Sequence, residues 1–268
     1  FGFQDNQFVT YKDKTLDGCL AHSLFIAGFL FDRTPFNAQP RYVVDDLVGI
    51  TAKASFTASV VHKTSGGQLH SPAAERNSAQ IIELVRSSVP ESGNALEIAS
   101  GTGQHIVELA AAVPGLIWQP SDIDETRLSS IASRCLAKQL TNLLPPIRLD
   151  VTDKGWSAFC PNQDFILLVN LLHLVSAAEV RAIISGISQS LAEDGRCVIY
   201  GPFMRNGVLS SSGDKVFHQS LMEADPDIGY KDDAWMFDLF SRQSLKIIRT
   251  LEMPANNLAF VMEKDNTN

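Results

Sequence analysis

The chain has 268 residues and a formal net charge of −8, so it is long enough to bury one substantial core or one domain with an appendage. The acidic balance argues against binding of duplex nucleic acid, which needs a basic face, and favours small-molecule or protein substrates. The four cysteines form no C-x-x-C pair. This spacing predicts neither a metal site nor a disulfide framework, and we expect reduced thiols in an intracellular, cytoplasmic protein.

Residues 1–70 differ from the rest of the chain. They hold six basic and six acidic residues, so the net charge comes entirely from residues 71–268. Their one strongly apolar run, Cys19 to Phe31, is too short to span a bilayer. An organellar or secretory leader fragment, a short added subdomain and translated upstream sequence without selected structure all fit this region. Ser65-Gly66-Gly67 predicts a flexible joint, and we place a domain boundary between residues 70 and 71.

A helix is predicted to begin at Ser71-Pro72, an N-cap followed by a proline in the first helical position, and to end near Pro90. Ahead of its buried stripe, the helix carries the polar side chains of Arg76 and Asn77. These two residues either reach a bound ligand or belong to a solvated first turn, and the sequence leaves both interpretations open.

The stretch after Ala95 predicts a strand, a turn of small residues and a helix. The short apolar strand carries one acid, Glu97, and the turn is Ser100-Gly101-Thr102-Gly103. Its glycines would let a ligand approach the backbone beside a helix N-terminus. Ile106 stands where a dinucleotide-binding turn has its third glycine, and no Lys-Ser/Thr pair follows as in a Walker A loop. The remaining pattern is typical of Rossmann-like methyltransferases that hold S-adenosylmethionine, or of a plain connection in an open α/β sheet.

Two further acids end the next apolar runs. Asp122 follows the turn at the distance where an acid can accept both ribose hydroxyls of a nucleoside. Asp150 ends a third run and is a candidate acceptor for the exocyclic amine of an adenine. Acids after three successive strands predict a cofactor edge. Each acid could instead cap the helix that follows it, although Asp124 is the better cap after Asp122.

Asp164 to Leu172 is an almost continuous apolar run, which predicts a central strand buried on both faces. Asn170 and His173 lie at its carboxyl end, where open α/β sheets bind ligands. His173 is a candidate general base, because an unperturbed imidazole has a pKa near ~6.5. A structural histidine that caps the next helix is the alternative. A base is needed only if the acceptor must lose a proton, since positioning alone can lower a barrier by roughly 7–11 kcal/mol.

The clearest helix follows a capping box at Ser176 to Glu179 and is predicted to end at Asp194-Gly195. The next strand leads to Tyr200 and Phe203, which would either wall an acceptor pocket or pack in the core.

Residues 210–230 are polar and weakly periodic, which predicts a loop-rich insertion. A short aromatic helix is predicted at Asp233 to Phe240. The alternating segments Leu245 to Leu251 and Leu258 to Glu263 predict a terminal hairpin.

From Ser71 to Lys264 the chain resembles the DUF938 family, a class I S-adenosylmethionine-dependent methyltransferase-like group; residues 1–70 match nothing in that family. The resemblance implies an α/β, Rossmann-like class I methyltransferase fold, with a seven-stranded, mostly parallel sheet, an antiparallel terminal hairpin and helices on both faces. The stretches that carry it are Ala73-Ala74-Glu75-Arg76-Asn77, Leu96 to His105, Trp118-Gln119-Pro120-Ser121-Asp122, Leu149-Asp150-Val151-Thr152, Asn170 with His173, Tyr200-Gly201-Pro202-Phe203 and Met253 to Asn257.

The resemblance implies methyl transfer from S-adenosylmethionine but does not supply the acceptor. We expect an unidentified small-molecule acceptor, with the oligomeric state left open. The alternatives are a binding or regulatory protein that keeps the fold without catalysis, and a nicotinamide dehydrogenase, which Ile106 counts against. Ala99 stands where many methyltransferases have the first glycine of the glycine-rich motif. This departure is compatible with weaker or altered cofactor binding. The expected cofactor residues are Arg76, Asn77, Glu97, Ala99, Ser100, Gly101, Gly103, Asp122 and Asp150, and the expected acceptor-facing residues are Asn170, His173 and Tyr200.

Overall fold

The computed structural model describes residues 61–64 and 67–266. The predictions for residues 1–60, and for Ser65 and Gly66 of the joint, lie outside the described residues. The described elements are β1 (His62–Lys63), β2 (Leu69–His70), α1 (Pro72–Arg86), β3 (Gly93–Ile98), α2 (Gln104–Ala112), β4 (Leu116–Asp122), α3 (Glu125–Lys138), β5 (Ile147–Arg148), the 3₁₀ helix η1 (Trp156–Phe159), β6 (Gln163–Val169), the 3₁₀ helix η2 (Leu172–Leu174), α4 (Ala177–Ser190), β7 (Leu191–Met204), α5 (Ser212–Ala224), β8 (Lys231–Asp232), α6 (Asp233–Arg242), β9 (Leu245–Met253) and β10 (Asn257–Lys264).

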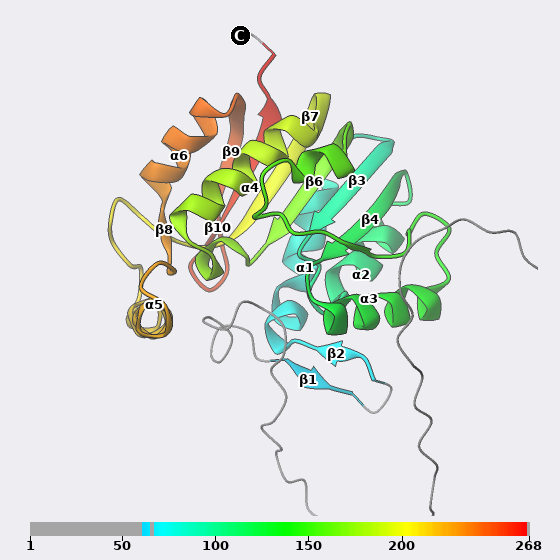
Figure 1. Cartoon of the computed structure of the whole chain (residues 1–268), viewed down its shortest axis with the longest axis horizontal. Helices are drawn as coiled ribbons and strands as arrows, with labels where there is room; N and C mark the ends of the chain where they lie inside the picture. The colour runs from blue at the N-terminus through cyan, green and yellow to red at the C-terminus, as the bar shows by residue number, and fades with distance from the viewer. Residues whose placement is uncertain (1–60, 65–66, 267–268) are drawn as a thin grey trace, which may run out of the picture. The chain divides into compact units, whose positions relative to one another are not determined.

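Seven strands form the main sheet in the order β5-β4-β3-β6-β7-β10-β9. The first five of these strands are parallel, and β10 runs antiparallel to both β7 and β9. From β3 the chain steps outward to β5 and then crosses to the other side of β3 to form β6, so the strand order reverses between β3 and β6 (Figure 1). The predicted mostly parallel sheet with an antiparallel terminal hairpin is confirmed. The short strand β8, which pairs with the end of β7, is an addition.

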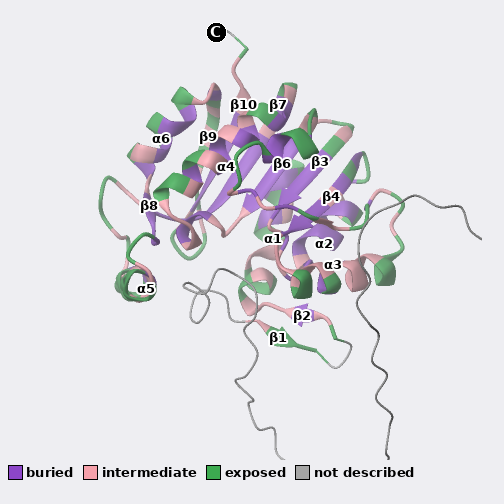
Figure 2. Cartoon of the chain, viewed as in Figure 1, coloured by how far each residue is buried: buried purple, intermediate pink, exposed green. Residues whose placement is uncertain are grey.

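Helices cover both faces of the sheet, as predicted. In β6, Phe165 and Leu167 pack with α1 and α2, whereas Ile166 and Leu168 pack with α4 and α6. Figure 2 shows the resulting buried strands between the two helical layers. Because both faces are covered, the strand can be apolar at nearly every position, which explains its continuous hydrophobic run.

The capping box of α4 is present, because Ser176 accepts a hydrogen bond from the Glu179 amide and Glu179 accepts one from the Ser176 amide. The predicted end of the helix was wrong: α4 ends at Ser190 and β7 begins at Leu191. Gly195 lies inside this long strand, where a Cβ atom would come within 2.7 Å of the Gln163 carbonyl oxygen. The glycine therefore serves a close approach of neighbouring strands and does not end the helix.

The prediction of a loop-rich insertion at residues 210–230 was also wrong in part, because this region contains α5. Ser211 caps α5 by accepting a hydrogen bond from the Asp214 amide. Leu221 of the helix packs with Ile228 and Tyr230 in a small separate cluster. The buried stripe of α5 is narrow, which accounts for its weak sequence periodicity.

The terminal hairpin and the aromatic helix α6 are present where the sequence predicts them. Ahead of α1, the short strands β1 and β2 pair antiparallel. The domain boundary between residues 70 and 71 stays a prediction. No helix in the described part of the chain has the length and apolar character that a membrane crossing requires.

Candidate functional site at the carboxyl ends of the parallel strands

The turn between β3 and α2 has an unusual backbone. Ala99, Gly101 and Gly103 have φ values of 52°, 60° and 79°, in the left-handed region that favours glycine. The Ser100 amide donates a 2.7 Å hydrogen bond to the Ser121 carbonyl oxygen, which ties this turn to the end of β4. The positive φ values and this hydrogen bond together give the turn a defined backbone conformation.

The two glycines of this turn have different surroundings. A Cβ atom on Gly101 would meet nothing closer than the Ala99 carbonyl oxygen at 3.9 Å, whereas one on Gly103 would lie 3.0 Å from Ile131 Cα on α3. Gly101 therefore borders open space in which a ligand could approach the backbone. Gly103, which was also expected to admit the ligand, is needed for the close packing of α3.

Asp122, the last residue of β4, connects to the glycine turn directly. Its Oδ2 accepts a 2.9 Å hydrogen bond from the Gly101 amide, and its Oδ1 accepts a 3.0 Å bond from the Asp124 amide. Burial raises the pKa of Asp122, while the Arg127 charge opposes this shift. Each carboxylate oxygen can accept a further hydrogen bond, so Asp122 still has acceptors for a ligand.

Glu97 is buried in β3, with 2 % of its surface exposed, and its Oε2 has no hydrogen-bond partner among the described residues. Burial raises the pKa of Glu97 to about 8; a hydrogen bond from Ser100 opposes this shift and the charge of Asp122 adds to it. The side chain is therefore mainly protonated at neutral pH. A cationic ligand bound beside this acid would favour its ionised form, because an opposite charge stabilises a carboxylate.

Asp150 follows β5 at the same edge. Its Oδ1 accepts hydrogen bonds from the Thr152 amide and the Thr152 hydroxyl at 2.9 and 2.6 Å. Its Oδ2 makes no hydrogen bond with the described residues, so it remains a possible acceptor. Asp150 thus closes a turn with Thr152 and does not cap the next helix, η1, whose N-cap is Gly155, so the capping alternative was wrong for this residue.

Asn170, which directly follows β6, lies beside Tyr200 in β7. The Asn170 amide donates a 2.8 Å hydrogen bond to the Tyr200 carbonyl oxygen, and a φ of 56° at Asn170 turns the chain away from the strand. A Cβ atom on Gly201 would lie 3.6 Å from Asn170 Oδ1. Asn170 is therefore held at the edge by its backbone, and its side chain makes no hydrogen bond with the described residues.

Tyr200 belongs to a polar chain inside the protein. Burial raises its pKa, and hydrogen bonds with Asn77 and Asn257 oppose that shift. The Asn77 Oδ1 lies 2.9 Å from His105 Nε2, and burial lowers the pKa of His105 to about 4, so this imidazole is neutral. His105 and Asn257 were not predicted from the sequence as site residues. A polar residue on the buried face of a predicted helix was the available signal for His105.

His173, in η2, packs against Phe217 of α5 and against Tyr230. Its ring centroid is 5.8 Å from that of Phe217 and 6.2 Å from that of Tyr230. Burial and, to a smaller extent, the Lys231 charge together lower the pKa of His173 to about 3. An imidazole with this pKa is a weak base, which favours a structural role for His173, but that role is ring packing and not capping, because Ser176 caps α4. Phe203 is likewise a core residue, with its ring 4.9 Å from that of Phe260.

Arg76 is exposed on α1 and makes no ion pair with the described residues. It does not contact the glycine turn through any hydrogen bond in the described part of the chain. Arg76 is therefore free to reach a ligand or to stay in solvent, and both alternatives stay open.

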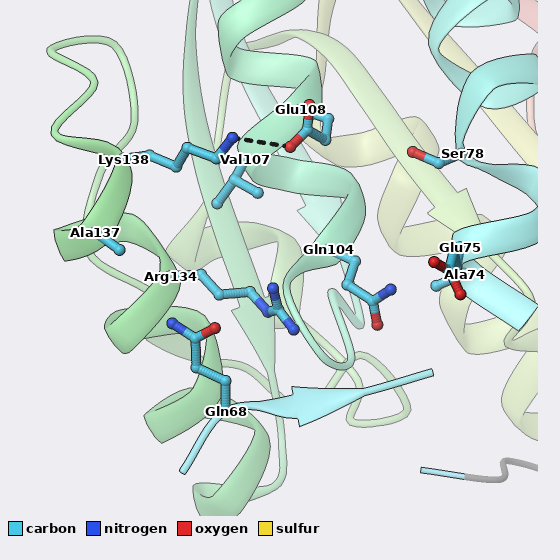
Figure 3. Close-up of a pocket in the computed structure, with 10 residues that line it drawn as sticks. All are labelled: Gln68, Ala74, Glu75, Ser78, Gln104, Val107, Glu108, Arg134, Ala137 and Lys138. Atoms are coloured by element: carbon cyan, nitrogen blue, oxygen red, sulfur yellow. Dashed lines mark hydrogen bonds and ion pairs between the residues drawn. The ribbon is translucent and has the colours of Figure 1, made fainter. Parts of the chain in front are cut away.

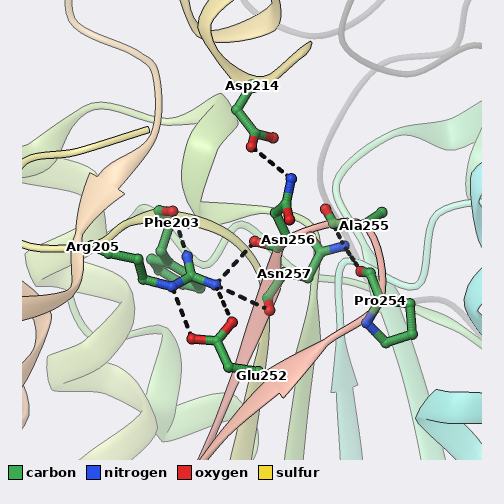
Figure 4. Close-up of polar contacts among 8 residues, drawn as sticks. All are labelled: Phe203, Arg205, Asp214, Glu252, Pro254, Ala255, Asn256 and Asn257. Carbon is green, nitrogen blue, oxygen red and sulfur yellow. Dashed lines mark hydrogen bonds and ion pairs between the residues drawn. The ribbon is translucent and has the colours of Figure 1, made fainter. Parts of the chain in front are cut away.

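Arg205 fixes the turn between β9 and β10. Its guanidinium donates to both carboxylate oxygens of Glu252, at 3.3 and 2.8 Å, and to the carbonyl oxygens of Asn256 and Asn257 (Figure 4). Asn256 Nδ2 in turn donates a 3.0 Å hydrogen bond to Asp214 Oδ2 on α5. The hairpin turn thereby connects the end of β7 to the insertion.

Within the described ranges, no group of three or more His, Cys, Asp or Glu side chains is arranged to hold a metal ion. The structure therefore provides no candidate metal ligands to add to this edge.

A family model described as a protein of unknown function, DUF938, matches residues 68–264. An O-methyltransferase family protein from Burkholderia thailandensis is similar in structure, with a TM-score of 0.62 and 15 % identity over 73 % of this chain and 58 % of that one. An O-methyltransferase family 2 protein from Planctomyces limnophilus, in complex with apigenin, has a TM-score of 0.60 and 17 % identity over 71 % of this chain and 59 % of that one. CalO1, a methyltransferase in calicheamicin biosynthesis with S-adenosylhomocysteine bound, has a TM-score of 0.57 and 16 % identity over 72 % of this chain and 55 % of that one.

The similarity to these structures identifies the fold as the Rossmann-like fold of class I methyltransferases. This chain spans less than two thirds of the length of each of the three proteins, so their activities are not carried over with the fold.

Proposed function

The chain belongs to the DUF938 family, and from the geometry of its site we propose that it transfers a methyl group from S-adenosylmethionine to a small-molecule acceptor. The observation that carries this proposal is the 2.9 Å hydrogen bond from the Gly101 amide to Asp122. It brings an open glycine turn and a carboxylate together beside the reversal of strand order, where open α/β sheets bind their ligands.

The residues of the edge fit S-adenosylmethionine. When bound, this cofactor supplies an activated methyl group on a sulfonium centre. Gly101 would let the cofactor come close to the backbone of the turn. The free lone pairs of the Asp122 carboxylate would accept hydrogen bonds from the ribose hydroxyls. The Oδ2 of Asp150 would accept from the adenine amine. Glu97, whose buried Oε2 has no partner in the described part of the chain, would orient the turn and the cationic amino end of the cofactor.

The acceptor side would act mainly by positioning. Asn170 is held by its backbone bond to Tyr200 and presents a side-chain amide at the end of β6. Tyr200 would form part of the wall of the acceptor pocket, where its hydrogen bonds with Asn77 and Asn257 would hold it in place. His173 would stabilise this region by packing against Phe217 and Tyr230. It would not act as the base, because its pKa of about 3 makes it a poor proton acceptor.

A second candidate is a cofactor-binding or regulatory protein without catalysis. The observation in its favour is that Tyr200 and His173, two of the expected acceptor-facing residues, are both buried. Formation of S-adenosylhomocysteine in the presence of any acceptor would exclude this candidate.

The experiment that tests the proposed cofactor is calorimetric titration of the full chain with S-adenosylmethionine and, in parallel, with NAD. The full chain should bind S-adenosylmethionine, and Asp122→Ala should weaken this binding at least about tenfold, or about 1.4 kcal/mol. Saturable binding of NAD alone would support a dehydrogenase instead. Absence of S-adenosylmethionine binding would reject the proposed function.

Asp164→Ala is the matched control. Asp164 also accepts a hydrogen bond from a backbone amide, that of Asn94 at 2.7 Å, but it lies at the start of β6, on the opposite edge of the sheet. This variant should bind S-adenosylmethionine as the unaltered chain does. An equal loss in both variants would show that the effect of Asp122→Ala is one of general stability.

A further inference from the structure

The segment Gln68 to Ser71, immediately before α1, is attached to α3 by side chains. The Leu69 amide donates a 2.8 Å hydrogen bond to Ser130 Oγ, and the Leu69 carbonyl oxygen accepts a 2.5 Å bond from Arg134 Nη2. Gln68 Nε2 also donates to Ser133 Oγ at 3.2 Å. Leu69 therefore satisfies both of its backbone groups with side chains of α3.

The same α3 side chains hold the glycine turn. Ser130 Oγ and Arg134 Nε each donate a 3.0 Å hydrogen bond to the Thr102 carbonyl oxygen, which lies between the two glycines. Ser130 is almost fully buried, and burial lowers the pKa of Arg134. Removal of either donor would leave a buried carbonyl oxygen with a weaker set of partners.

Gln104, the first residue of α2, completes the connection from the turn to α1. Its Oε1 accepts hydrogen bonds from the Ser71 amide at 2.6 Å and from Thr102 Oγ1 at 2.8 Å, and its Nε2 donates to the Ser71 carbonyl oxygen at 3.3 Å. Ser71 is the N-cap of α1. One side-chain amide thus fixes both the glycine turn and the start of the helix that carries Arg76 and Asn77.

We propose that Gln104 and Arg134 are positioning residues that hold the glycine turn in its ligand-binding conformation and couple it to residues 68–71. The proposal rests on the proposed function for the identity of the ligand. The turn contains three residues with left-handed backbones, so it depends on hydrogen bonds from outside to keep its conformation. A turn that is fixed before binding has less conformational entropy to lose when the cofactor binds.

These residues also line a cleft of about 310 Å³ between α1, α2 and α3. Figure 3 shows the Arg134 and Gln104 side chains extending toward β2 from α3 and α2. Lys138 lines the same cleft but pairs with Glu108 at 3.0 Å and makes no hydrogen bond with the turn. Lys138→Met is therefore a control that alters the cleft and leaves the turn untouched.

The test measures the affinity of the full chain for S-adenosylhomocysteine by calorimetry and the exchange of the Leu69 and Ser71 amides by hydrogen exchange. Gln104→Leu should weaken binding about tenfold, because it removes three hydrogen bonds at nearly constant volume. Gln104→Glu keeps the acceptors for Ser71 and Thr102 and should recover part of the affinity. Arg134→Met should weaken binding to a similar degree, and Lys138→Met should change it less than about twofold. Binding should slow the exchange of both amides in the unaltered chain and not in Gln104→Leu.

The outcomes separate the two proposals. If the unaltered chain does not bind S-adenosylhomocysteine, the proposed function fails and the positioning role fails with it. If the unaltered chain binds and the Gln104 and Arg134 variants bind equally well while folded, only the positioning role is overturned. Loss of thermal stability without a change in affinity or in the response of the two amides would show a purely structural role, and would also overturn it.

Discussion

Gly101 and Asp122, which are 21 residues apart in the chain, are joined by a hydrogen bond of 2.9 Å from the amide of one to the carboxylate of the other. This bond connects the turn after β3 to the end of β4, at the edge where the parallel strands end. Asp122 therefore stabilises the turn. The proposed function gives its remaining lone pairs a second role, in ligand binding, which experiment can separate from the first.

Asp122→Asn tests whether the negative charge is needed. The asparagine oxygen can still accept from the Gly101 amide, but its nitrogen would face the Asp124 amide, another donor. We expect the free energy of unfolding to fall by about 1–2 kcal/mol. Affinity for S-adenosylhomocysteine should fall about tenfold, because an amide nitrogen cannot accept a hydrogen bond from a ribose hydroxyl. Unchanged affinity in calorimetry would show that the carboxylate does not contact the ligand.

Glu97 should make the protein less stable at alkaline pH. Its pKa is raised from 4.5 to about 8 in the folded state, so between these values the folded protein keeps a proton that the unfolded chain has lost. The free energy of unfolding should therefore fall as pH rises from 4.5 through 8, by at most about 5 kcal/mol from this group. In Glu97→Gln this contribution disappears. Urea denaturation of both proteins at several pH values measures the difference, and parallel profiles would contradict the prediction.

His173 should have the opposite effect at acid pH. Burial lowers its pKa from 6.5 to about 3, so the stability that depends on the neutral ring is present above pH 6.5 and is lost as pH falls toward 3. His173→Phe keeps an aromatic ring against Phe217 and Tyr230 and removes the titration. The variant should lose less free energy of unfolding than the unaltered chain between about pH 7 and pH 4. If acid destabilises both proteins equally, His173 does not titrate as its burial requires.

The hydrogen bond from Asn256 to Asp214 should stabilise α5 on the hairpin turn. Asn256 has a left-handed φ of 58°, so Asn256→Gly removes the side chain without adding backbone strain. Amide exchange along α5 should become faster by about fivefold, which corresponds to about 1 kcal/mol. Gln219→Ala, on the exposed side of α5, is the control and should leave most of this exchange unchanged. Equal exchange rates in all three proteins would show that α5 is held by its apolar cluster alone.

The apolar strands and the expected position of the candidate site could be predicted because both depend on local patterns, whereas the order of the strands in the sheet could not. Continuous apolar runs mark strands covered on both faces, and Glu97, Asp122 and Asn170 stand at or near the ends of such runs. Parallel strands then bring these ends to one edge without any knowledge of side-chain packing.

The contacts that shape the site could not be predicted in the same way. Gln104 reaches Ser71 across 33 residues, and His105 reaches Asn77 across 28 residues, only because α1 packs along α2. Periodicity predicts that both helices are amphipathic, but it does not predict how they cross. The burial of His173 similarly depends on α5, whose narrow apolar stripe made the region look like a loop.

The two glycines of the turn should respond differently to the same substitution. Gly101→Ala places a Cβ atom in open space, so its cost to folding is the strain of a left-handed alanine, about 1–2 kcal/mol. Gly103→Ala adds to this strain a Cβ atom only 3.0 Å from Ile131 Cα and should be the more destabilising of the two. Gly155→Ala is the control for strain alone, because Gly155 has a φ of 87° and no atom within 4 Å of its Cβ position. Of Gly101→Ala and Gly155→Ala, only the first should lose affinity for S-adenosylhomocysteine, by more than about tenfold, because its methyl group occupies the space that a bound cofactor needs. Urea denaturation and calorimetric titration measure both effects, and a Gly101→Ala variant that binds like the unaltered chain would show that the ligand does not pass over this turn.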